Sequence, residues 1–170
     1  MAERHLIVDH LKFSYEGLFN LTELYTIIPA WFYDKGYDWY EKMNQELVTS
    51  AGKQFKLIFE PWKNVGDYNK IVMNIHLNMI DVKEVEVQQD NKTLNLSQGL
   101  IRMTFDAYVV SDRFNRLYKR PLFWFLSVLA DKYFYRSFFN KFETWVKSDV
   151  DDLYEKIKNY LNVYKYQYQT

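Results

Sequence analysis

Two acidic residues on predicted strands have the carboxyl groups that acid–base catalysis requires. Glu16 and Asp106 each lie where apolar and polar residues alternate, and each falls on the side opposite the apolar residues. A general acid and a general base would have to face one cavity in different environments. The alternative is that both are solvent-facing charges on the outer surface of a sheet. We favour this alternative and predict no catalytic residue.

Metal binding and covalent catalysis find little support in the residue types. The chain has no cysteine, which excludes a thiol nucleophile and thiolate ligands. Three histidines are present: His5, His10 and His76. No two of them lie four residues apart on one expected helix, so we interpret them as solvated or singly hydrogen-bonded. Asp149, Asp151 and Asp152 are explained by the preference for acidic residues in the first turn of a helix. We predict no metal site and no cofactor.

Known nucleotide and hydrolase motifs are missing. A phosphate-binding loop needs clustered glycines between a strand and a helix, and the 5 glycines of this chain form no such cluster. There is no Gly-x-Ser-x-Gly turn, which would expose a nucleophilic serine. We therefore expect a protein that binds rather than one that catalyses a reaction.

The segment from Phe114 to Trp145 is unusually rich in aromatic rings. Between residues 112 and 142, seven basic residues stand against two acidic ones. A helix that is apolar all round is typical of a buried helix, and an incompletely covered one would leave a ring-lined pocket for an apolar ligand. An exposed version would dock a protein partner, a second copy or a lipid surface. Stacking on single-stranded nucleic acid is disfavoured by the balanced charge of the whole chain.

The pocket interpretation has specific candidates. Rings of the expected helix would face methionines and a phenylalanine of the strands, and methionine adapts its shape to irregular ligands. The six predicted ligand-binding residues are Met73, Met103, Phe105, Trp124, Phe125 and Tyr133.

The strands are predicted from alternation of apolar and polar residues. The predicted segments lie near 9–19, 37–48, 55–59, 71–79, 85–87, 94–96 and 101–109. The segment 37–48 also fits a helix, and we prefer a strand. Glu60-Pro61-Trp62 should end one strand because proline cannot donate to a central ladder, and Gly99 should mark a bulge or a turn.

The helices are predicted from capping residues and from a change of period. Asn20, with Glu23 three residues later, resembles a capping box. Pro121 should open a long helix that ends near residue 147. Ser148 should cap a final helix, and the tail from Tyr164 should be extended.

Composition limits the class of protein. The chain has 170 residues, 22 basic and 22 acidic side chains, 48% hydrophobic and 19% aromatic residues. These values exclude a disordered chain and a nucleic-acid binder that works through bulk charge. The longest apolar run, 121–130, is half of the roughly 20 residues that a membrane-spanning helix needs. We predict one domain, 1–170, with a β-rich body over 1–112 and a helical part over 113–164.

The predicted fold class is α+β. We expect a curved antiparallel sheet of about six or seven strands packed on a long C-terminal helix, with one helix after the first strand. This order of elements resembles the helix-grip arrangement of START-like proteins. The segments 17–19, 81–87 and 119–126 also resemble uncharacterised archaeal proteins, a resemblance that implies no activity.

The expected function is that of a non-catalytic binding module. An apolar small molecule or lipid would occupy a cavity between the sheet and the aromatic helix. The alternative is a protein–protein or self-association module that uses the same helix. A peripheral membrane binder and an enzyme are weaker alternatives, and we expect a cytoplasmic location without a transmembrane segment.

Overall fold

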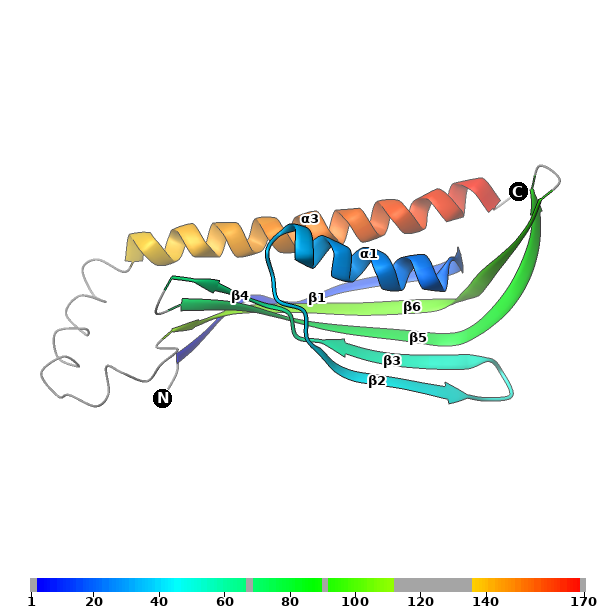
Figure 1. The fold of residues 1–170 in the computed structure, drawn as a ribbon, viewed down its shortest axis with the longest axis horizontal. Coiled ribbons are helices and arrows are strands. Elements are labelled where there is room, and N and C mark those ends of the chain that lie inside the picture. The colour runs from blue at the N-terminus through cyan, green and yellow to red at the C-terminus, as the bar shows by residue number, and fades with distance from the viewer. Residues whose placement is uncertain (1–2, 67–68, 90–91, 112–135, 169–170) are drawn as a thin grey trace, which may run out of the picture.

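The computed structural model describes residues 3–66, 69–89, 92–111 and 136–168 (Figure 1). The described elements are β1 (Glu3–Phe19), α1 (Leu21–Asp34), β2 (Glu41–Val48), β3 (Lys53–Phe59), β4 (Trp62–Val65), β5 (Asn69–Gln89), β6 (Lys92–Ser111) and α3 (Arg136–Tyr168). Most of the aromatic segment, including Trp124, Phe125 and Tyr133, lies outside the described residues.

The strands form one open antiparallel sheet. Six strands take part, in the order β1-β6-β5-β3-β2, and β4 pairs with β5 outside this path. The helices α1 and α3 lie on the same side of the sheet, with α3 running along its length (Figure 1). The predicted α+β class is therefore confirmed, as are the number of strands and the helix after the first strand.

The ambiguous segment before residue 48 contains a strand. Residues 41–48 form β2, which pairs with β3 from Glu41↔Phe59 to Val48↔Lys53. The preference for a strand is thus confirmed over residues 41–48. The short strand β4 was not predicted, because Pro61 suggested only the end of a strand. Pairing with Val72 of β5 extends the chain again at Trp62.

A bulge bends the sheet near the end of the β5–β6 hairpin. Pairing jumps from Ile80↔Leu100 to Lys83↔Gln98, so two residues of β5 oppose Gly99 alone. A β-bulge increases local twist and bends its strand, and Figure 1 shows this hairpin turning toward the C-terminal end of α3. A Cβ atom at Gly99 would lie 2.9 Å from the carbonyl oxygen of Ile80. The predicted irregularity is confirmed, with the extra residue on β5.

The two helices differ in how well the sequence predicted them. Asn20 caps α1 as expected, since its Oδ1 accepts a hydrogen bond from the backbone N–H of Glu23 at 3.2 Å. The prediction that Ser148 caps a separate helix is wrong. α3 continues from Arg136 to Tyr168 through Ser148, and the tail from Tyr164 is helical rather than extended. A stripe of buried residues that runs unbroken along α3 explains this continuity, because helices are stabilised mainly by packing.

The core lies between the helix-covered face of the sheet and the two helices. Alternate residues of β5 are buried there: Ile71, Met73, Ile75, Leu77 and Met79. The stripe of α3 that meets the sheet consists of Phe142, Val146, Val150, Leu153, Ile157 and Leu161. Burying one such side chain stabilises the fold by roughly 1.5–3 kcal/mol, so this layer fixes both helices on the sheet.

Candidate ligand pocket

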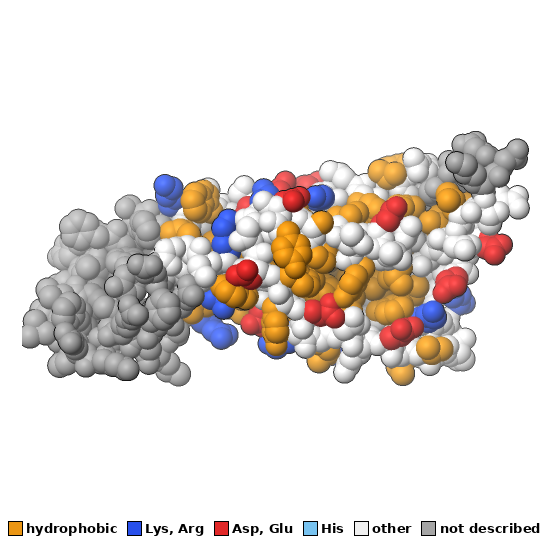
Figure 2. All heavy atoms as spheres, in the orientation of Figure 1, with side chains coloured by type: hydrophobic (Ala, Val, Ile, Leu, Met, Phe, Trp, Pro, Cys, Tyr) orange, Lys and Arg blue, Asp and Glu red, His pale blue; other side chains and the backbone are white. Residues whose placement is uncertain are grey.

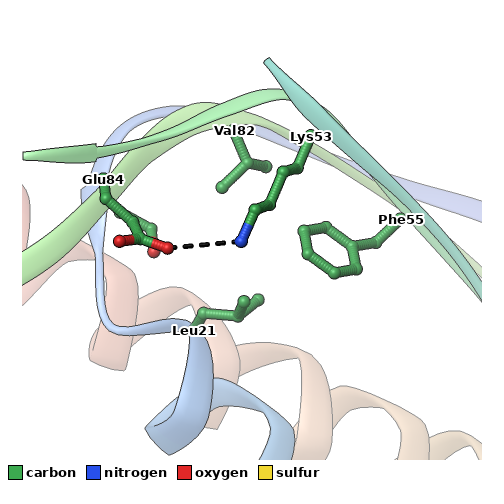
Figure 3. A pocket seen from close by; sticks show the side chains of 6 residues that line it. Leu21, Lys53, Phe55, Val82 and Glu84 are labelled. Carbon is green, nitrogen blue, oxygen red and sulfur yellow. Dashed lines mark hydrogen bonds and ion pairs between the residues drawn. The ribbon is translucent and has the colours of Figure 1, made fainter. Parts of the chain in front are cut away.

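A pocket of about 290 Å³ lies at the bent end of the sheet (Figure 3). It lies between the first turn of α1 and the strands β3, β5 and β6. The lining residues are Leu21, Lys53, Phe55, Val82, Glu84 and Ser97.

Strand register brings the lining residues of the sheet together. Lys53 pairs with Val82, and Glu84 pairs with Ser97. Directly paired residues of an antiparallel sheet lie on the same face, so these four side chains share the helix-covered face. Leu21 is the first residue of α1 and closes the pocket from the opposite side (Figure 3).

The lining of the pocket is mixed, with three apolar side chains, Leu21, Phe55 and Val82, and three polar ones, Lys53, Glu84 and Ser97. Figure 3 shows the ammonium group of Lys53 between the ring of Phe55 and the carboxylate of Glu84, above Leu21. Val82 and Ser97 are buried. In such a pocket, the apolar part of a ligand would contact carbon atoms. Its polar end would meet one cation, Lys53, and one anion, Glu84.

The ion pair beside the pocket is loosely held. Lys53 Nζ lies 3.3 Å from Glu84 Oε1 and 3.9 Å from Glu46 Oε1. The side chains of Lys53 and Glu84 are 44% and 79% exposed. Ion pairs in such exposed positions contribute about 0–1 kcal/mol, so Lys53 and Glu84 can rearrange around a ligand at little cost.

The predicted ligand-binding residues lie elsewhere. Met73, Met103 and Phe105 are 1%, 1% and 2% exposed and belong to the core. The ring of Phe105 lies 6.2 Å from that of Tyr154 of α3, which covers it. None of the three lines the described pocket, and their role in binding stays a prediction. The other three, Trp124, Phe125 and Tyr133, lie outside the described residues.

Sequence reasoning missed the pocket because its residues come from four separate places in the chain, in α1, β3, β5 and β6. Phe55 was recognised as part of a strand, and Gly99 as an irregularity. What the sequence did not reveal was that the bulge opposite Gly99 faces the first turn of α1.

The two candidate catalytic carboxylates are far apart. Glu16 pairs with Leu100, and Asp106 lies six residues further along β6, which corresponds to roughly 20 Å of strand. Asp106 accepts a hydrogen bond from the backbone N–H of His10 at 2.7 Å. The structure therefore does not bring Glu16 and Asp106 together as an acid–base pair.

The acidic residues of α3 hold α1 in place. Asp152 Oδ2 accepts a hydrogen bond from Trp31 Nε1 at 2.9 Å and lies 3.0 Å from Lys35 Nζ. These two donors lower the pKa of Asp152. Asp149 Oδ2 accepts from the hydroxyl of Tyr37 at 2.8 Å, and burial, followed by the charge of Asp149, raises the pKa of Tyr37. Asp149 and Asp152 therefore do not mark the first turn of a helix, as the sequence suggested, but hold α3 against α1 and the residues that follow it.

A second polar contact fixes the beginning of α1, next to the pocket. The carboxylate of Glu23 accepts hydrogen bonds from the hydroxyls of Tyr160 and Tyr164 at 3.1 and 2.6 Å. Tyr160 also donates to the backbone oxygen of Asn20 at 3.0 Å. The pKa of Tyr160 is raised, first by burial and then by Tyr164 and Glu23. The helix wall of the pocket is thereby fastened to α3.

Comparison with known proteins yields no relative. No protein-family description, no curated protein and no solved structure matches this chain. Of the helices in the described part of the chain, none has the length and apolar character needed to cross a membrane.

Proposed function

We propose that this protein is a non-catalytic binding module that holds a small, mainly apolar ligand in the pocket at the bent end of the sheet. The observation that carries the proposal is the space of about 290 Å³ left between α1 and the bulged strands, which Leu21, Phe55 and Val82 line with carbon. Small-molecule sites are typically apolar cavities of roughly 300–1,000 Å³ with a few polar groups that orient the ligand. This pocket is at the lower end of that range and fits a compact ligand.

The polar groups define the expected shape of the ligand. An apolar body would contact Leu21, Phe55 and Val82, and one polar end would reach Lys53 or Glu84. Figure 2 shows hydrophobic side chains gathered over α1 and the surface below it, with charged side chains around them. An amphipathic molecule entering from this side would meet apolar surface before it reaches the pocket.

We also propose that the fold is of the helix-grip type and that the protein is cytoplasmic. The helix-grip comparison with START-like proteins rests on the order of elements and on α3 lying along the sheet. A cytoplasmic location rests on the absence of cysteine, which suits a reducing compartment.

The experiment uses three ligands with the same eight-carbon tail and different heads: octanol, octanoate and octylammonium. Binding to the full chain is followed by methyl NMR shifts, which should concentrate at Leu21 and Val82. A preference for octanoate would assign the head group to Lys53, and a preference for octylammonium would assign it to Glu84. Leu21→Trp should fill the pocket and abolish binding.

The control variant is Leu47→Trp, which places the same ring on an exposed position of β2 that pairs with Gln54, on the face of the sheet opposite to Lys53 and Phe55. Its binding should equal that of the unmodified chain. The proposal is wrong if none of the three ligands binds up to its solubility limit, or if Leu21→Trp binds as well as Leu47→Trp. Sedimentation of the same samples gives the alternative its own outcome, because self-association would appear as a concentration-dependent mass.

A further inference from the structure

A second bulge lies in β1, on the opposite face of the sheet from the pocket. Pairing with β6 jumps from Val8↔Ala107 to Leu11↔Phe105. Asp9 and His10 therefore lie opposite Asp106 alone, with one extra residue on β1, and His10 has a positive φ of 51°. The bulge brings the carboxylate of Asp9 and the imidazole of His10 close to the carboxylate of Asp106.

The three side chains form a compact group of possible ligand atoms. One nitrogen or oxygen from each of Asp9, His10 and Asp106 lies within 4.8 Å of the other two. His10 Nδ1 lies 3.3 Å from Asp106 Oδ1 and also contacts the carboxylate of Asp9. Zinc binds imidazole nitrogen and carboxylate oxygen at about 2.0–2.2 Å, so tetrahedral ligand atoms lie about 3.3–3.5 Å apart. The distance of 3.3 Å between His10 Nδ1 and Asp106 Oδ1 already equals that expected between two ligand atoms of a tetrahedral zinc ion.

Asp106 is oriented by the backbone, and a further oxygen lies beside it. The backbone N–H of His10 donates to Asp106 Oδ1 at 2.7 Å, which fixes the carboxylate at the bulge. Asn74 of β5 pairs with Asp106 and shares its face. Asn74 Oδ1 is shielded from solvent and has no hydrogen-bond donor among the described residues. A water molecule on a bound ion would supply the missing donor.

We propose that Asp9, His10 and Asp106 bind a zinc ion on the outer face of the sheet, with water in the remaining coordination position. Imidazole and carboxylate together suit zinc, whereas carboxylates alone would suit magnesium or calcium. One nitrogen and two oxygens from protein leave an open position. The site shares no residue with the ligand pocket, so it stands independently of the proposed function.

The test is calorimetric titration of the full chain, free of any affinity tag, with zinc chloride. One zinc ion should bind per chain. His10→Asn should lower the affinity at least about 100-fold, since loss of a partner that only orients a ligand already costs 10–100-fold. Asparagine tolerates the positive φ of this position better than other residues, so the bulge should persist. His76→Asn is the matched control, because it removes an imidazole from β5, where His76 pairs with Thr104 outside the cluster, and it should leave the affinity unchanged.

A second variant keeps the test decisive if His10→Asn fails to fold. Asp106→Asn retains an oxygen that accepts from the His10 N–H but removes the charge that zinc requires. It should weaken zinc binding by a similar factor, with circular dichroism unchanged. The proposal is overturned if the chain does not bind zinc at millimolar concentration. It is also overturned if folded His10→Asn or Asp106→Asn binds zinc as tightly as the control.

Discussion

The space between the sheet and the helices is filled in the middle and open at the bent end. In the middle, α3 packs on β1 and β6, and Met73, Ile75 and Met103 are all but inaccessible. At the bent end, the first turn of α1 faces a bulge, and a pocket of about 290 Å³ remains. Apolar side chains occur in both regions, but three of the six residues that line the pocket are polar.

The two regions also differ in the regularity of their strands. Where β5 and β6 keep their register, side chains of the sheet alternate evenly and meet a continuous helical stripe at high density. Where two residues of β5 oppose Gly99, the strands turn, and a pocket remains between them and the first turn of α1. A pocket can thus lie beside one irregular position in an otherwise close-packed layer.

The largest expected loss of stability is at the close-packed middle of the layer between sheet and helices. Met103→Ala should destabilise the fold by roughly 2–5 kcal/mol, because a close-packed core cannot collapse around the cavity. Leu21→Ala, in the pocket wall, should cost clearly less, because one side of Leu21 already faces open space. Urea unfolding of both variants measures the two costs. Equal costs would remove the distinction between the two regions.

The next effect concerns the bulge that opens the pocket. Gly99→Ala would place a Cβ atom 2.9 Å from the carbonyl oxygen of Ile80 and 3.1 Å from Cα of Val82. Relief of this overlap must move backbone, and overpacking of this kind costs about 1–3 kcal/mol. Unfolding by urea should show this loss, while exposed Gln98→Ala should change stability by less than about 0.5 kcal/mol. A neutral Gly99→Ala would mean that the close approach is not required.

A smaller, pH-dependent loss of stability is expected when Asp152 loses its contacts with Trp31 and Lys35, which hold α1 over the filled region. Asp152→Asn should cost about 0.5–1.5 kcal/mol near neutral pH, the usual net contribution of a hydrogen bond. The folded-state pKa of Asp152 lies below the ordinary 3.8. Its carboxylate therefore stabilises the fold above pH 3.8, and this contribution is lost as the pH falls through the folded-state pKa.

Thermal unfolding between pH 2 and 7 measures this dependence. The unmodified chain should lose more stability on acidification than Asp152→Asn does. Asp151→Asn, which changes an exposed neighbour on the same helix, should keep the full pH dependence. If Asp152→Asn and Asp151→Asn follow the same curve, the contact with Trp31 and Lys35 does not stabilise the fold.

The smallest effect is expected at the polar side of the pocket. Lys53→Gln removes an exposed ion pair with Glu84, and it should change stability by less than about 1 kcal/mol. The same variant should change the preference among the three ligand head groups, because the cation near the pocket is lost. Urea unfolding and the ligand titrations together separate these outcomes. A loss of stability as large as that of Met103→Ala would show that the bent end is part of the core.

The sequence determined the local elements of this protein. Alternation in segments such as 71–79 predicted strands because side-chain direction in a strand depends only on the local backbone. Asn20 and Glu23 predicted the start of α1 because a helix cap involves neighbouring residues. The α+β class followed from the order of these elements. Ser148 misled the same reasoning, because a capping residue is only a local preference and the packed stripe of α3 overrides it.

Only the tertiary structure decided which distant residues meet. His10 and Asp106 are 96 positions apart and come together through strand register and a bulge. Leu21 meets Val82 for the same reason, because α1 is fastened across a sheet that bends opposite Gly99. Register is set by the sum of many weak contacts along two strands. For that reason neither the pocket nor the Asp9–His10–Asp106 cluster appears in any short stretch of sequence.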